Sequence, residues 1–146
     1  MVMGGSWSAY WYNGVIVSSE IARGLDVYEI VPNALISENE LAAAKTVKQP
    51  YWNTQDQQKL VWPTTFVLAR AYLDQLARTN GLPAAQIDSA RTALAKAEKG
   101  NAKDRHASLT ELATQLTTAA SASSDQAKVK MLASTVTTLA GTGSGS

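Results

Sequence analysis

The sequence contains no cysteine, which excludes disulfide bonds, thiolate chemistry and zinc sites built from cysteine. An excess of charge of one sign is also missing, because 13 Lys and Arg offset 12 Asp and Glu and leave a formal net charge of +1. The basic residues form no cluster along the chain. The sequence therefore predicts neither nucleic-acid binding nor binding to an anionic membrane surface.

Long apolar runs and the usual catalytic signatures are absent as well. No stretch approaches the roughly 20 apolar residues of a membrane-spanning helix. The opening MVMGGSW lacks the basic and apolar regions of a signal peptide. The sequence has no phosphate-binding glycine loop, HExxH, dinucleotide fingerprint or GxSxG elbow. We therefore expect no cofactor, no metal ion, no membrane partner and no targeting signal within this chain.

The apolar content, 45% of 146 residues, is enough for a modest core. The segment GGSWSAYWYNGVIVSSEIARGLDVYEIV (4–31) is rich in aromatic and β-branched residues, which favour strands. Asn13-Gly14 is a strong hairpin signal, because both central residues of a type I′ turn need positive φ. IARG (21–24) predicts a second turn. We expect an antiparallel meander with strands over 6–12, 15–20 and 25–31, and with Leu25, Val27 and Glu29 on one face and Asp26, Tyr28 and Ile30 on the other.

A short helix is expected next. In SENE (37–40), Ser37 can cap the helix and Glu40 can reach back to the Ser37 backbone, as in a capping box. This motif predicts a helix over 38–47. The polar residues 50–59 then predict a loop.

Four longer helical segments follow, each bounded by residues that start or stop helices. The expected boundary residues are Pro63 and Gly81 for the first, Pro83 and Gly100 for the second, Asn101 or a neighbour for the start of the third, and Ser123 or Ser124 for the start of the last.

Each of these segments carries apolar residues at helical spacing, and short connections between them favour an up-down bundle of antiparallel neighbours. The predicted core stripes are Phe66, Ala69, Leu73 and Leu76; Ile87, Ala90, Leu94 and Ala97; Leu109, Leu112, Leu116 and Ala119; and Val129, Leu132, Val136 and Leu139.

The predicted fold class is α+β, mainly α, with a short N-terminal antiparallel β-meander followed by an up-down helical bundle. We divide the chain into the β-meander (1–31), a short helix and loop (32–60), the bundle (61–140) and a flexible linker tail, GTGSGS (141–146). The outer strands of the meander leave N–H and C=O groups unpaired, so we expect a homo-oligomer that forms through these edges.

The stretch WSAYWYNGVIVSSEIARGLDVYEI resembles the final repeat of the LVIVD-repeat proteins, which are secreted bacterial proteins of β-propeller type. LVWPTTFVLARAYLDQL resembles the helical tail that follows that repeat. The resemblance covers about residues 4–140. It implies a fragment of a propeller blade, a secreted or extracytoplasmic parent protein and a structural or binding role, and it supplies no catalytic residue.

Three carboxylates and one histidine are the candidate catalytic residues. Glu20, Asp26 and Glu29 surround the second turn together with Arg23, and carboxylates beside an arginine can act as acids and bases or bind a hard cation. The same residues also suit a turn held by a salt bridge, which we favour. His106, the only histidine, could act as a base, but its polar neighbours favour an exposed side chain.

An aromatic cluster near the N-terminus is the candidate binding surface. It could form a platform for a planar ligand, an apolar cover between sheet and bundle, or a surface for self-association. The candidate ligand-binding residues are Trp7, Trp11, Tyr28, Arg23 and Trp62.

The sequence leaves two functions open. The favoured one is a non-catalytic structural or interaction module, the C-terminal part of a secreted repeat protein, that self-associates through its β edge. The alternative is a small hydrolase of activated esters or phosphoesters, with an aromatic and carboxylate-lined pocket at the seam between sheet and bundle or at an oligomer interface.

Overall fold

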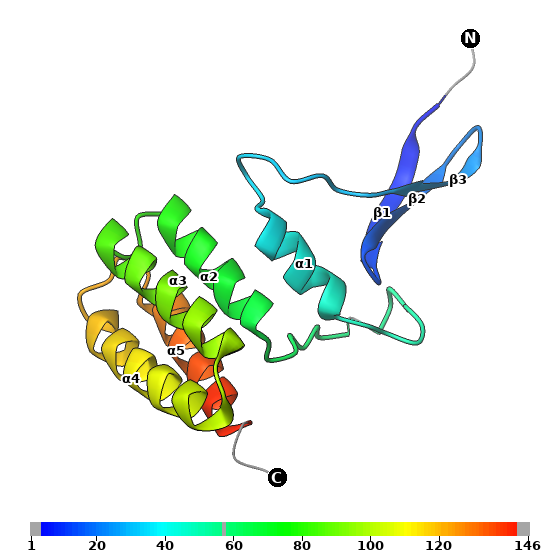
Figure 1. Cartoon of the computed structure of the whole chain (residues 1–146). Helices are drawn as coiled ribbons and strands as arrows, with labels where there is room; N and C mark the ends of the chain where they lie inside the picture. The colour runs from blue at the N-terminus through cyan, green and yellow to red at the C-terminus, as the bar shows by residue number, and fades with distance from the viewer. Residues whose placement is uncertain (1–3, 57, 143–146) are drawn as a thin grey trace. The chain divides into compact units, whose positions relative to one another are not determined.

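A computed structural model of the chain describes residues 4–56 and 58–142. Over these residues the fold is α+β and mainly α, with a three-stranded antiparallel sheet followed by five helices (Figure 1). The chain divides into two compact units, Met1–Pro63 and Thr64–Ser146.

The meander of the first unit consists of β1 (Ser6–Tyr12), β2 (Val15–Glu20) and β3 (Gly24–Tyr28), in the order β1-β2-β3. The turn between β1 and β2 has positive φ at both central residues, 52° at Asn13 and 107° at Gly14. This confirms the conformation that the Asn-Gly pair predicts for a two-residue hairpin.

The third strand ends at Tyr28 rather than at Val31, so its predicted length is wrong. Tyr28 lies opposite Ile16, and β2 begins at Val15. Residues beyond Glu29 therefore pass the end of β2 and have no strand to pair with. The predicted alternation of faces holds within β3. This strand pairs regularly with β2, so its successive side chains point to opposite faces, Leu25 and Val27 to one and Asp26 and Tyr28 to the other.

The hairpin turn is fastened to the chain that leaves the first helix, α1 (Glu38–Thr46). The Asn13 side chain accepts a hydrogen bond from the Gln49 N–H at 2.8 Å and donates one to the Gln49 carbonyl at 2.9 Å. The Tyr12 hydroxyl donates to the same carbonyl at 3.2 Å. A Cβ on Gly14 would lie 3.2 Å from Cγ of Lys45, so that side chain would have to shift slightly, and the φ of 107° strains any residue with a side chain.

The capping box of α1 is confirmed. The Ser37 hydroxyl accepts a hydrogen bond from the Glu40 N–H at 3.1 Å, and the Glu40 carboxylate accepts one from the Ser37 N–H at 2.7 Å. Two N–H groups at the start of the helix thereby gain partners that the helix itself cannot supply.

The second unit is a bundle of four helices among the described residues: α2 (Phe66–Arg78), α3 (Ala84–Lys99), α4 (Ala102–Ala120) and α5 (Gln126–Gly141). Contacts join α2 to α3, α3 to α4, α4 to α5, and α5 back to α2. Each helix therefore packs against two others, and the four close around one core.

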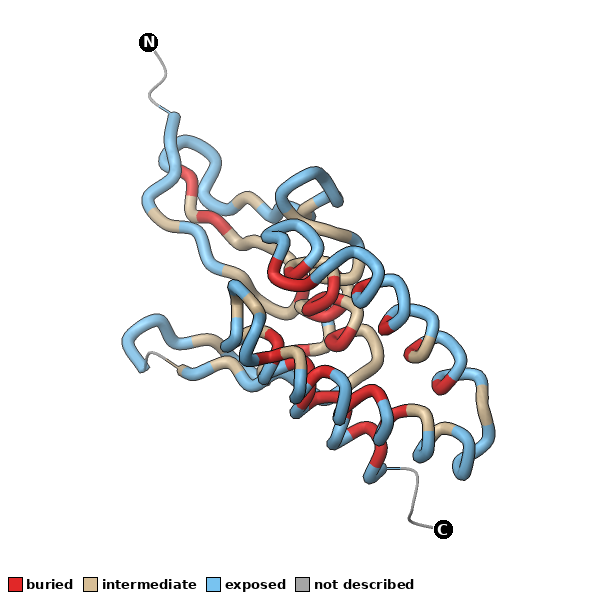
Figure 2. The backbone as a smooth tube through the Cα atoms, turned by 90° about the vertical axis from the view of Figure 1, so that its left-hand side faces the viewer, coloured by how far each residue is buried: buried red, intermediate tan, exposed pale blue. Residues whose placement is uncertain are grey.

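The predicted apolar stripes form this core, and Figure 2 shows buried residues recurring along the helices. Phe66 and Ala119 are half-buried, whereas the other predicted members are buried. The side chains that are almost completely enclosed are Leu73, Leu76, Leu94, Leu109, Leu132, Val129 and Val136.

Two predicted helix starts are wrong. The α2 helix starts after Thr65, whose hydroxyl accepts a hydrogen bond from the Leu68 N–H at 3.1 Å, and Pro63 lies before the helix and outside it. The α5 helix is capped by Asp125, whose carboxylate accepts from the Lys128 N–H at 2.9 Å. In both cases the cap is a side-chain acceptor directly before the first helical residue.

Ser123 does not cap α5 because its hydroxyl has other partners. It accepts a hydrogen bond from the Asp125 N–H at 2.9 Å and donates one to the carbonyl of Gly81 at 2.6 Å. The loop between α4 and α5 is thereby tied to the loop between α2 and α3. At its other end α5 reaches Gly141, inside the predicted linker 141–146, and 143–146 lie outside the described residues.

No helix among the described residues is long and apolar enough to span a lipid bilayer.

Replacing Leu109 by Ala should lower the free energy of unfolding of the helical bundle by about 2–5 kcal/mol, because it leaves a cavity beneath a completely buried side chain. The change is measured by urea denaturation followed by circular dichroism. Thr114→Ala is the matched control, since Thr114 is exposed on the same helix. Equal effects of the two substitutions would contradict the position of the core.

Candidate functional site

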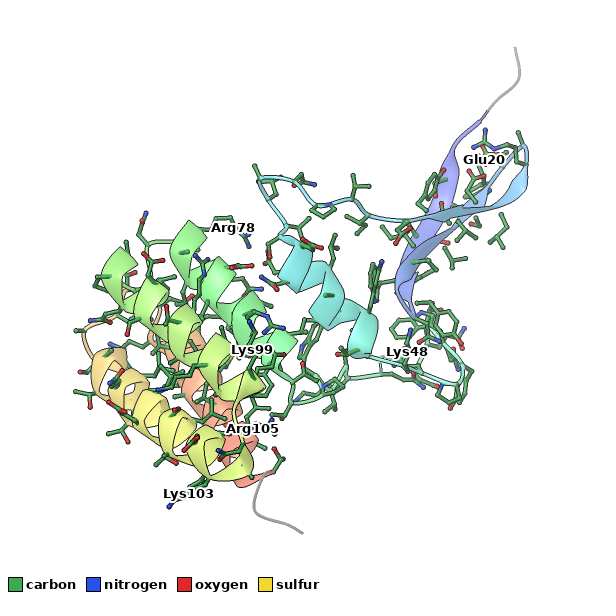
Figure 3. The ribbon with its side chains drawn as sticks, in the orientation of Figure 1. Glu20, Lys48, Arg78, Lys99, Lys103 and Arg105 are labelled. Carbon is green, nitrogen blue, oxygen red and sulfur yellow. The ribbon has the colours of Figure 1, made fainter. Side chains whose placement is uncertain are left out.

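The second turn of the meander is organised around the Glu20 carboxylate. Its side chain is 6% exposed. One oxygen accepts a hydrogen bond from the Gly5 N–H at 2.7 Å, and the other accepts from the N–H groups of Ala22 and Arg23 at 2.8 and 2.6 Å. Figure 3 shows Glu20 at the end of the sheet where β2 turns into β3. The carboxylate thus joins the start of β1 to this turn.

These hydrogen bonds determine the chemistry of Glu20. The bond from the Gly5 N–H, followed by that from Arg23, holds the pKa of Glu20 below its ordinary value against the opposing effect of burial. A general base that works near neutral pH needs a higher pKa and an accessible oxygen. The geometry therefore gives Glu20 a structural task, which is to supply acceptors for three backbone N–H groups.

Arg23, Asp26 and Tyr28 form a chain of polar contacts beside this turn. The Arg23 guanidinium lies 2.6 Å from the Asp26 carboxylate, and the Tyr28 hydroxyl donates to the same carboxylate at 2.8 Å. The hydrogen bond from Arg23 lowers the pKa of Asp26, and the bond to Asp26 raises the pKa of Tyr28. Arg23 is mostly exposed, so this is a surface salt bridge that contributes little to stability.

Glu29 does not join the other two carboxylates. It lies beyond the end of β3 and pairs with Lys45 of α1, with 2.5 Å between Nζ and Oε1. This hydrogen bond holds the pKa of Glu29 below its ordinary value. The structure therefore brings Glu20 and Asp26 together around Arg23 and places Glu29 in a separate contact with α1.

His106 belongs to the second unit, in the first turns of α4. Its Nδ1 lies 3.0 Å from the Ala140 carbonyl, near the C-terminal end of α5. A carbonyl only accepts hydrogen bonds, so Nδ1 donates and carries a proton. This contact satisfies a carbonyl at a helix end, where the helix itself lacks donors. No pattern in the sequence predicts this partner.

The sheet register divides the aromatic cluster between two faces. Trp11, Ile16 and Tyr28 lie opposite one another and share one face of the sheet. Tyr10 lies opposite Val17 and Val27 on the other face. Trp7 occupies an irregularity of β1 between Ser6 and Ser8 and is 77% exposed. Successive residues of a strand point to opposite faces, so neighbours in sequence cannot form one continuous platform here.

Trp62, the remaining aromatic candidate, is exposed in the segment that precedes α2. Of the candidate ligand-binding residues, the structure therefore places Trp11 and Tyr28 on one sheet face. The Tyr28 hydroxyl and the Arg23 guanidinium both donate to the Asp26 carboxylate.

Both outer strands have free edges, and the register shows which residues face outward. Tyr12 and Val15 flank the two-residue turn, so odd-numbered residues of β2 direct their backbone groups to β1 and even-numbered ones to β3. The hydrogen bond from the Ile21 N–H to the Gly5 carbonyl follows this pattern. On β3, the residues whose backbone N–H and C=O groups point away from β2 are therefore Leu25 and Val27.

On β1, the corresponding outward residues are Ala9 and Trp11. Within the part of the chain that the structure describes, the backbone N–H and C=O groups that point away from the sheet on these strands form no hydrogen bond with another backbone group. Such edges are templates for the addition of another strand.

Two grooves on the helical bundle were not predicted. One, of about 530 Å³, lies between α3 and α4 and is lined by residues such as Gln86, Ser89 and Leu112. The other, of about 460 Å³, lies between α4 and α5 and is lined by His106 and several threonines. The sequence gives only a weak signal for these grooves, because the small exposed Ala, Ser and Thr residues that line them are common on helix surfaces.

No group of three or more His, Cys, Asp or Glu residues in the described ranges 4–56 and 58–142 is placed to hold a metal ion.

Comparison of this chain with known protein families, with curated proteins and with solved structures finds no match. The resemblance to the LVIVD-repeat proteins therefore stays a prediction from the residues that carry it.

The amide protons of Gly5, Ala22 and Arg23 should shift together in NMR spectra as the pH falls below 4.5, the ordinary pKa of glutamate. The pKa of Glu20 is lowered in the folded chain, so ionised Glu20 stabilises the meander fully above that pH, and the stabilisation is lost as the pH falls through the folded pKa.

Glu20→Gln should remove this common titration, and Glu111→Gln on α4 is the control for a change of charge elsewhere. A shared titration that persists in Glu20→Gln would contradict the assignment of these three N–H groups to the Glu20 carboxylate.

Proposed function

We propose that this chain is a non-catalytic structural or interaction module that associates with copies of itself through an edge of its β-meander. The observation that carries the proposal is a three-stranded sheet with two free edges and exposed apolar side chains. Small sheets with unpaired edges gain stability when further strands are added.

Exposed apolar side chains support an interaction surface on the meander. Leu25 and Val27 are 62% and 60% exposed, and Tyr10, on the same face of the sheet, is also exposed. Contiguous apolar surface of this kind is typical of sites where proteins associate. It is also continuous with the free edge of β3, so one partner strand can satisfy the backbone groups and cover the side chains.

The candidate catalytic residues support a structural role. Glu20 accepts three backbone hydrogen bonds, Asp26 and Glu29 pair with basic side chains, and His106 donates to a helix-end carbonyl. Each group has a partner that accounts for its position without a substrate. No observation on these residues favours the hydrolase alternative.

The resemblance to the LVIVD-repeat proteins suggests the kind of protein to which this module belongs. It implies that the meander derives from the last blade of a propeller-like sheet, in a secreted or extracytoplasmic protein. In such a sheet, strand edges are protected by neighbouring repeats. We propose that self-association supplies the same protection to the strand edges of this chain.

Light scattering behind a sizing column should give a mass of a dimer or a larger oligomer, because a free strand edge with apolar side chains is available in every copy. The mass should fall toward that of the single chain on dilution. A monomer at every concentration tested would contradict the proposed function.

Hydrolysis of p-nitrophenyl acetate and p-nitrophenyl phosphate should proceed no faster with this protein than with its Glu20→Gln, Asp26→Asn, Glu29→Gln and His106→Ala variants. The measurement is the absorbance of released nitrophenolate under identical conditions. Turnover well above background that disappears in one of these variants would favour the hydrolase alternative instead.

A further inference from the structure

The two free edges of the meander differ, and β3 is better suited to accept a second copy. β1 is interrupted between Ser6 and Ser8, where Trp7 is the extra residue in the ladder. Bulges in edge strands hinder the addition of another strand. β3 pairs regularly with β2 from Gly24 to Tyr28, so its outer edge is uninterrupted.

We propose that two copies associate through β3 in antiparallel orientation, with a twofold axis that passes between the two copies of Val27. This inference rests on the proposed self-association and specifies its edge and register. The two three-stranded sheets then form one six-stranded sheet.

The register of the two β3 strands is set by which residue the twofold axis places opposite the same residue of the other copy. With the axis at Asp26, two carboxylates would lie on the same face with Cα atoms about 4.5 Å apart, and like charges in this position are destabilising. With the axis at Leu25, the ladder would run into the turn at residues 21–23. With the axis at Val27, the ladder extends from Leu25 to Glu29, because the chain does not turn again before Ala34.

The resulting pairs are chemically compatible. Asp26 of one copy lies opposite Tyr28 of the other, and Leu25 lies opposite Glu29, so no like charges meet. Both Val27 residues direct their backbone groups outward and exchange two N–H···O=C hydrogen bonds across the axis.

The apolar row on one sheet face also becomes continuous. Tyr10, Val17 and Val27 lie opposite one another across the three strands. The axis at Val27 joins this row to its symmetry mate, so six side chains line up across the combined sheet. Cross-strand aromatic and β-branched pairs of this kind stabilise sheets. A second copy is thus complementary to this edge in both its backbone groups and its side chains.

The edge can be tested with proline, which removes an outward N–H and leaves the hydrogen bonds inside the meander intact. Val27→Pro should lower the dimer association constant about tenfold or more, because both hydrogen bonds across the axis are lost. Ala9→Pro is the matched control, since Ala9 faces outward on β1. Sedimentation equilibrium measures the association constant, and circular dichroism checks that each variant folds.

The register can be tested by charge. Val27→Lys and Val27→Glu should each dissociate the dimer, because like charges meet at the axis, and an equimolar mixture of the two should restore it as a heterodimer. These substitutions are on an exposed side chain and do not depend on a proline being tolerated. Leu35→Lys, at an exposed leucine outside the sheet, controls for added charge.

Recovery of the dimer in the Lys and Glu mixture, together with loss of association in Val27→Pro, is the expected result. Dimers that survive all three Val27 substitutions but are lost in Ala9→Pro would overturn the inference and leave the proposed function standing, with β1 as the edge. A wild-type chain that is monomeric throughout would overturn both.

Discussion

The two-residue turn at Asn13-Gly14 determines the arrangement of the whole meander. Both residues have positive φ, a conformation that few other residue pairs adopt without strain. The turn fixes which residues of β1 and β2 lie opposite each other, and a shift by one residue would move every side chain to the other face. The positions of the free edges, the apolar row and the Glu20 carboxylate all depend on this turn.

The Glu20 turn and the hairpin turn hold the meander at opposite ends. At one end, a single carboxylate satisfies three N–H groups from two segments. At the other, Asn13 forms two hydrogen bonds with Gln49. Neither end relies on a large apolar core, so the meander is stabilised by polar contacts and by its strand register. The helical bundle is stabilised by its buried leucines. This is why we expect the meander to be the part that responds to pH and to association.

Features encoded by near neighbours could be predicted from the sequence. The capping box at Ser37 and Glu40 needs only a spacing of three residues, and the apolar stripes of the bundle need only helical periodicity. The turn at Asn13-Gly14 is of the same kind. Each is fixed by the conformational preferences of the residues involved, without help from distant parts of the chain.

Features that depend on distant partners could not be predicted. Ser123 is a plausible cap for α5 by sequence, but its hydroxyl donates to the Gly81 carbonyl, 42 residues away. Glu20 reads as a charged turn residue, yet its partner Gly5 lies 15 residues earlier. The end of β3 depends on where β2 begins, and the donor role of His106 depends on Ala140. No local pattern contains these pairings.

The hydrogen bond between Ser123 and Gly81 also bears on the dynamics of the bundle. It joins two loops at one end of the helices, and a Cβ on Gly81 would lie 2.6 Å from the Leu76 side chain, so this loop is tightly enclosed. Neither loop can open to solvent without releasing the other. The amides of both loops should therefore exchange with solvent as one cooperative unit, although they are separated by two complete helices along the chain.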